Sequence, residues 1–264
     1  MQFTKRIGSA GSTAFYFTDS RDGGMSNAQQ IYLADRIMSY RTRFASLAVN
    51  AVWDFGMEEG DPVRSDKYGE FELCRDNAVY NAQMLTISFN HARLRKMNCE
   101  ADPDEIAQIL AYHRQHKDLC ERALEMQAQL LAQGIPWPKI GAMLLEKLGI
   151  TPCAENALAV TDRYFADVQA IRMLENTESL ERLTAHEIGH MLSEESGAVH
   201  DKRIRKLFGE CSDGFENLYE FCAECFMASE LTDGIDLADR YRSILETILC
   251  SQDHRLSRWP AQPL

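Results

Sequence analysis

The chain has 264 residues, of which 45% are hydrophobic, and its 28 Lys and Arg against 40 Asp and Glu give a formal net charge of -12. This composition is enough for one large or two small packed domains of a globular protein. An acidic chain without a block of Lys or Arg lacks the basic face that phosphates require, so we expect neither nucleic acid nor a membrane as a partner. The charge favours a basic peptide or protein as substrate.

The amino terminus and the cysteines favour a cytoplasmic protein. The chain contains no apolar run near the length of about 18 residues that a membrane span needs. The first residues are polar and Gly-rich, so we expect no secretory signal, which leaves export by a signal-less route as the alternative. Eight Cys are scattered along the sequence without the density of a disulfide scaffold, so we expect reduced thiols.

The first hundred residues predict one long helix and little sheet. The strand-like patch near the amino terminus is Phe15-Tyr16-Phe17. Ser26 with Gln29 has the pattern of a capping box, and the apolar residues that follow predict a helix as far as about Phe55. Between residues 70 and 97 the pattern fits either a strand or a helix.

A second long helix is predicted to begin at Asp102 and Pro103 and to end at Gly134. His113 and His116 lie on it among charged residues, so we expect them to be solvated rather than metal ligands.

Three segments follow before the central motif. Residues 138–148 and 151–165 predict helices. Residues 167–173 fit either an edge strand, against which a substrate backbone pairs, or the tail of the preceding helix.

The central motif is His186-Glu187-Ile188-Gly189-His190, an HExxH in a predicted helix. Two His four residues apart lie on one face of a helix, where both imidazoles can bind one zinc ion. The Glu between them can take the proton of a zinc-bound water, so the motif combines a Lewis acid site with a general base. Gly189 lets a neighbouring backbone or a substrate approach closely.

A third ligand is expected from the apolar helix over residues 217–227. Glu216, Glu220 and Glu224 recur every fourth residue along it. A carboxylate buried without a partner is costly, so Glu220 and Glu224 should be paired, protonated or bound to a metal. One of them would bind the zinc, and the next could accept a hydrogen bond from a ligand His.

The HExxH and this second helix together resemble the lethal-factor-type zinc peptidases, which are gluzincins with a later EFFAEAF-like helix. The resemblance covers residues from about 180 to 230, about a fifth of the chain, and includes Ser212, Gly214 and Asn217. It implies a zincin-like metallopeptidase domain with Glu220 as the third zinc ligand and Glu224 as its support. The matching segment is Glu220-Phe221-Cys222-Ala223-Glu224-Cys225-Phe226.

The chain departs from this family at one catalytic position. The family places a Tyr seven residues before the third ligand, as a donor to the oxyanion, and Asp213 stands there. Tyr219, Tyr164 or His200 would have to donate instead, and we select Tyr219. A more distant similarity, to the regulator-cleaving peptidases of mobile elements, would make Glu216 the ligand, although its other positions match out of register.

The sequence therefore predicts a mainly α fold, with α+β as the alternative. Residues 1–150 form a helical lid or partner-binding region, and residues 151–264 form the zincin-like domain with a small or absent sheet. His186, His190 and Glu220 bind one Zn2+ per chain, and Glu187 is the general base of an endopeptidase that acts on a protein or peptide.

Two other functions compete with this prediction. One is a non-catalytic, zinc-stabilised binding or assembly protein of a phage or mobile element, with Cys211, His200 or Asp213 as a fourth ligand. The other is a protein without metal that docks a partner through its helical amino-terminal half. Nothing in the sequence specifies an oligomeric state.

Overall fold

The computed structural model describes residues 5–10, 13–44, 47–56, 65–66, 69–70, 77–148, 163–211 and 214–256. Over these residues the chain is mainly helical, as predicted, with one main sheet and a separate pair of short strands. The elements are β1 (Lys5–Ala10), β2 (Thr13–Phe17), η1 (Ser20–Asp22), α1 (Asn27–Arg43), β3 (Ala51–Phe55), β4 (Ser65–Asp66), β5 (Gly69–Glu70), β6 (Ala78–Asn81), β7 (Thr86–Asn90), α2 (His91–Leu94), α3 (Pro103–Ala132), α4 (Trp137–Leu148), α6 (Phe165–Glu175), α7 (Leu180–Glu195), η2 (Ala198–His200), α8 (Lys202–Gly209), α9 (Leu218–Leu231) and α10 (Asp236–Leu256).

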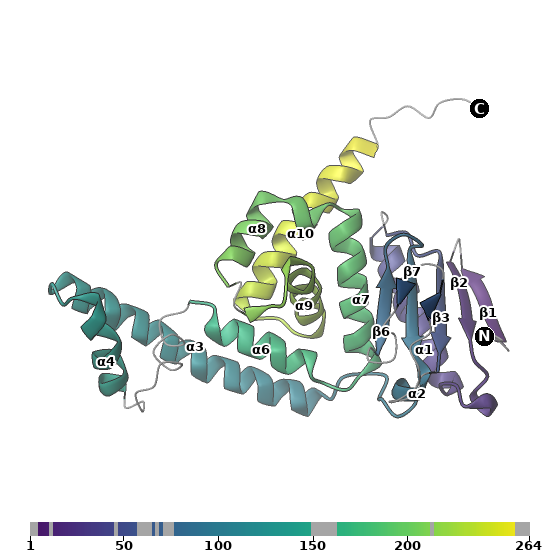
Figure 1. Ribbon diagram of the computed structural model, residues 1–264, viewed down its shortest axis with the longest axis horizontal. Helices are drawn as coiled ribbons and strands as arrows, with labels where there is room; N and C mark the ends of the chain where they lie inside the picture. Colours follow the sequence, from purple (N-terminus) through teal and green to yellow (C-terminus); the bar gives the residue numbers. More distant parts are fainter. Residues whose placement is uncertain are drawn as a thin grey trace.

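The main sheet has the strand order β1-β2-β3-β7-β6 and lies within residues 1–150, where the sequence predicted a mainly helical region. The strand-like patch Phe15-Tyr16-Phe17 belongs to β2, as predicted. Strands β2, β3 and β7 run parallel, whereas β1 and β6 pair antiparallel at the two edges. Strand β6 is thus at one edge of the sheet that the described strands form, and α7 runs beside it (Figure 1). This arrangement brings the sheet to the helix that carries the HExxH.

The first predicted helix begins as expected but ends earlier. The capping box is present, because the Gln29 backbone donates to Ser26 Oγ and the Ser26 backbone donates to Gln29 Oε1. The predicted continuation to Phe55 is wrong, since α1 ends at Arg43 and β3 follows. The apolar residues there are buried between β2 and β7, where β-branched and aromatic side chains such as Val52 pack well.

The structure resolves the two alternatives that the sequence left open. The stretch from 70 to 97 includes β6, β7 and the short helix α2. The strand alternative is therefore correct for the segment in which apolar residues alternate. Ile87 and Phe89 of β7 are fully buried. Residues 167–173 belong to α6, so they are helical and do not form the edge strand. The helix begins at Phe165 after its cap Tyr164, so it is a helix of its own rather than the tail of a preceding one.

Helix α3 forms as predicted, with Asp102 accepting a hydrogen bond from the Asp104 backbone and Pro103 in the first turn. The prediction that His113 is solvated is wrong. It is 2% exposed, and its Nε2 lies 2.6 Å from Oδ1 of Asp167 on α6. The face of α3 that carries His113 packs against α6, and Asp167 of α6 is the partner of the imidazole.

One hydrophobic core includes residues from both sides of the predicted boundary at residue 150, such as Phe89, Ile171 and Phe226. The boundary itself and most of the helix predicted over 151–165 lie outside the described residues. The far end of α3 and α4 project beyond this body and share small apolar clusters of their own (Figure 1). None of the described helices combines the length and apolarity needed to cross a bilayer.

Candidate metal centre

Helix α7 carries the two histidines of the HExxH on one face. Ser179 caps the helix by accepting from the Arg182 backbone. The helix is surrounded by α1, α9 and β6, so that His186 is 9% and Glu187 5% exposed. The Nε2 atoms of His186 and His190 lie 3.1 Å apart, so both imidazoles direct the same nitrogen at one point.

Close packing of α7 against α9 brings a carboxylate to that point. A Cβ on Gly189 would lie 2.9 Å from the Ala223 Cα and 3.0 Å from the Ala223 carbonyl oxygen. Only a glycine fits this contact without displacing backbone, which agrees with the close approach expected at Gly189. Asn217 caps α9 by accepting from the backbones of Tyr219 and Glu220. Glu220 therefore lies in the first turn of α9, facing the histidines.

The three side chains have the spacing of a tetrahedral metal site. Glu220 Oε2 lies 3.4 Å from His186 Nε2, and its Oε1 lies 3.6 Å from His190 Nε2. Ligands at about 2.0–2.1 Å from zinc in a tetrahedron are separated by about 3.3 Å. Both His nitrogens and the Glu oxygen are common zinc ligands, and together they leave one tetrahedral position for water or substrate. The three residues therefore fit a zinc ion.

Glu175, the last residue of α6, contacts the site but was not a sequence candidate. Its Oε2 lies 3.1 Å from His186 Nδ1, and its Oε1 accepts from Arg182 Nη1 at 2.8 Å. Glu175 precedes His186 by eleven residues and lies outside the HExxH, so the spacing of the motif does not indicate it. A carboxylate at a helix C-terminus, where the helix dipole disfavours negative charge, is the signal that could have identified it.

The charges around the histidines favour a cation. Burial lowers the pKa of His186, but hydrogen bonds to Glu175 and Glu220 outweigh burial and raise it to about 10. The same histidines hold the pKa of Glu220 well below its usual range. Burial raises the pKa of Glu187, which makes this carboxylate a stronger base.

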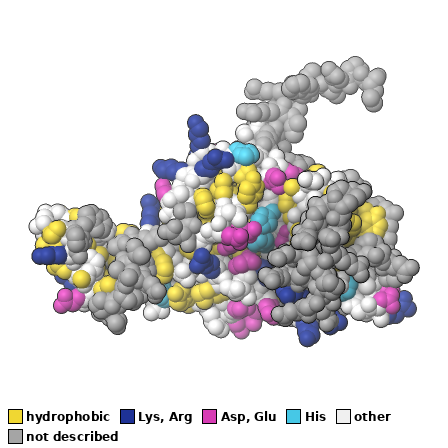
Figure 2. Space-filling model, viewed as in Figure 1, with side chains coloured by type: hydrophobic (Ala, Val, Ile, Leu, Met, Phe, Trp, Pro, Cys, Tyr) yellow, Lys and Arg dark blue, Asp and Glu magenta, His cyan; other side chains and the backbone are white. Residues whose placement is uncertain are grey.

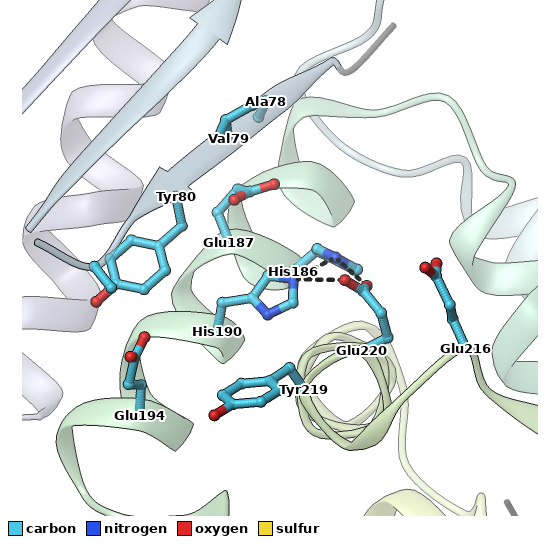
Figure 3. Close-up of a pocket in the computed structure, with 11 residues that line it drawn as sticks. Ala78, Val79, Tyr80, His186, Glu187, His190, Glu194, Glu216, Tyr219 and Glu220 are labelled. Atoms are coloured by element: carbon cyan, nitrogen blue, oxygen red, sulfur yellow. Dashed lines mark hydrogen bonds and ion pairs between the residues drawn. The ribbon is translucent and has the colours of Figure 1, made fainter. Parts of the chain in front are cut away.

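The site opens into a cavity of about 510 Å³ between α7, α9 and β6. Figure 2 shows acidic side chains and a histidine gathered at the centre of this face of the molecule. In Figure 3, Glu187 lies between the histidines and β6, while Tyr80, Glu194 and Tyr219 gather at the other end of the cavity. The lining residues are Ala78, Val79, Tyr80, Ala82, His186, Glu187, His190, Glu194, Glu216, Tyr219 and Glu220.

Among the described strands, β6 pairs with β7 alone, and Ala78, Val79 and Tyr80 of β6 line this cavity. The Asn90 backbone donates to the Asn77 carbonyl, and the antiparallel register pairs Val79 with Ser88. Because hydrogen-bonded and non-hydrogen-bonded pairs alternate, the backbone groups of Ala78 and Tyr80 point outward. Outward-pointing groups at the edge of a sheet are the ones with which an extended peptide can pair.

Of the other residues that the sequence suggested for the site, Tyr219 and Glu216 line the cavity, whereas Tyr164 and His200 do not. Tyr219 is 47% exposed and lines the cavity. Tyr164 is buried outside it and accepts from Arg240 Nη1. His200 is exposed and lies 3.3 Å from an Arg205 nitrogen. Glu216 lines the cavity but is not part of the three-residue ligand group.

Three further residues were proposed as additional ligands or supports. Cys211 is buried and its thiol donates to the Leu207 carbonyl, so it is directed away from the centre. Asp213 lies outside the described residues. Glu224 is partly buried, and burial, with the nearby Glu175 charge adding to it, raises its pKa to about 7.

Comparison of the chain with protein-family models, with curated protein sequences and with solved structures finds no match. The geometry of the site is therefore the basis for a proposed function.

Proposed function

We propose that the chain is a zinc-dependent endopeptidase of the gluzincin type, similar to the lethal-factor-like peptidases. The observation that carries this proposal is the convergence of His186, His190 and Glu220, with Glu187 beside them in an open cavity. A purely structural zinc site would be closed by a fourth protein ligand. Among the described residues the group has three members.

The chemistry that zinc supplies at such a site is that of a Lewis acid, which polarises the scissile carbonyl and makes water acidic enough to lose a proton near neutral pH. Glu187 accepts that proton. Its buried position, which raises its pKa, lets it hold the proton and then pass it to the leaving amine. The outward backbone groups of Ala78 and Tyr80 bind the substrate as an added strand beside Glu187. Tyr219 is the candidate donor to the oxyanion.

The proposal is tested by measuring zinc content and cleavage on the same preparations. We expect about one zinc ion per native chain by elemental mass spectrometry, and much less in Glu220→Ala. Glu187→Gln should keep its zinc and lose cleavage of a peptide library, because the amide cannot accept the proton. Native protein without zinc, even after zinc is supplied, would contradict the proposal. Cleavage that persists in Glu187→Gln would remove Glu187 from the role of base.

The same preparations test the non-catalytic alternative. If Asp213→Ala lost zinc as completely as Glu220→Ala and the native protein cleaved no peptide, the site would be closed and structural. Asp213→Ala with normal zinc content supports the open site.

A further inference from the structure

Glu175 does not stabilise the helix to which it belongs. It is the final residue of α6, where the exposed carbonyls already carry partial negative charge. A carboxylate there is disfavoured unless another group compensates it. Its contacts identify two such groups, both on α7.

Arg182 holds Glu175 from one side. Arg182 is 6% exposed, and its side chain donates from Nη1 to Glu175 Oε1 and from Nε to the Thr177 carbonyl at 3.1 Å. A buried guanidinium with two fixed acceptors has a single orientation. The other oxygen of Glu175 is thereby directed at His186 Nδ1, 3.1 Å away.

This contact determines which nitrogen of His186 is available as a ligand. When Nδ1 carries the proton and donates to Glu175, Nε2 keeps its lone pair. Nε2 is the atom that lies 3.1 Å from His190 Nε2 and 3.4 Å from Glu220 Oε2. Glu175 thus fixes both the tautomer and the ring orientation that the metal centre requires.

Glu224, which the family resemblance designated as the supporting carboxylate, has no such contact. Within the described part of the chain its side chain makes no hydrogen bond or ion pair with either histidine. It lies one turn beyond Glu220 on α9 and does not line the cavity.

We propose that Glu175, oriented by Arg182, is the positioning residue for the zinc ligand His186, and that Glu224 does not have this role. This proposal rests on the proposed zinc site and adds a residue that holds one of its ligands in place. Supporting partners of ligand histidines typically contribute about 10–100-fold to metal affinity. The effect should therefore appear in zinc binding itself, before any turnover is measured.

The test is zinc affinity, measured by competition with a chromophoric chelator, for native protein and for single variants. We expect Glu175→Ala to bind zinc about 10–100-fold more weakly, and Glu175→Gln to lose less, because its amide oxygen still accepts from Nδ1. Arg182→Gln should weaken binding to an intermediate degree. Glu224→Gln and the surface control Glu246→Gln should remain within about twofold of native, within the usual error for a residue without contact to the ligands.

A second readout separates positioning from loss of folding. In the zinc-loaded protein, nitrogen NMR of the imidazoles should show His186 protonated at Nδ1, and this signal should be altered in Glu175→Ala while that of His190 is not. Native affinity and an unaltered His186 signal in Glu175→Ala would overturn the inference while the zinc site stood. A loss of affinity in Glu224→Gln alone would assign the support to Glu224. Absence of zinc from the native protein would remove both the site and its support.

Discussion

Replacing Gly189 by Ala tests the contact on which the metal centre depends. The added Cβ would lie 2.9 Å from the Ala223 Cα, 3.0 Å from its carbonyl oxygen and 3.1 Å from the Phe226 Cβ. Carbon atoms pack at about 3.5–4.0 Å, so α7 and α9 must separate by about 0.5 Å or more. Overpacking of this kind costs about 1–3 kcal/mol, against a gain of about 1 kcal/mol from replacing a helical Gly by Ala. The net effect should be a destabilisation of up to about 2 kcal/mol.

The assay is urea unfolding with a zinc chelator present, which separates packing from metal binding. Gly209 of α8 is the matched control, since a Cβ there meets nothing within 4 Å, and Gly209→Ala should be neutral or stabilising. We also expect Gly189→Ala to bind zinc more weakly, because Glu220 moves away from the histidines with α9. A Gly189→Ala protein that is more stable than native and binds zinc normally would refute the close approach of the two helices.

Three further measurements test the cavity, the packing and the electrostatics. Glu194→Lys should lower kcat/KM for peptides with basic side chains by roughly 2- to 30-fold, since an attraction of about 0.2–1 kcal/mol becomes a repulsion; equal loss for neutral peptides would contradict this. Asp167→Ala should lower the free energy of unfolding by about 1–3 kcal/mol, because the buried His113 loses its hydrogen-bond partner, and an unchanged stability would contradict that role. With zinc chelated, the raised pKa of His186 predicts stability that is fully present below about pH 6.5 and falls as pH rises towards about 10; Glu175→Gln should flatten this profile in urea titrations.

Local signals in the sequence predicted the features that depend on neighbouring residues. The cap at Ser26, the start of α3 at Asp102 and the shared face of His186 and His190 all follow from spacings of a few residues. The approach of Glu220 to the motif follows from a similar argument, because a carboxylate in an apolar helix needs a partner.

Features that depend on distant partners were not predictable in the same way. The residues of β3 could form a helix by pattern, and only pairing with β2 and β7 makes them a strand. The charged neighbours of His113 predict a solvated side chain, because its partner Asp167 lies on α6, 54 residues away in the sequence. Glu175 reaches His186 only because the turn between α6 and α7 folds back through Arg182 and Thr177. No periodicity within one segment contains this information.

The edge strand β6 yields a prediction that separates binding of substrate from folding. The Ala78 N–H points away from β7 and, in the proposed function, donates to the substrate backbone, whereas the Val79 N–H pairs within the sheet. Proline lacks this donor and is tolerated on the open side of an edge strand but not in the ladder. Ala78→Pro should therefore fold and bind zinc normally, yet cleave peptides with a kcat/KM lowered by about 5- to 10-fold, the worth of one backbone hydrogen bond of about 1 kcal/mol. Val79→Pro should instead be destabilised in urea unfolding. If Ala78→Pro cleaved peptides as well as native protein, the substrate would not pair with β6.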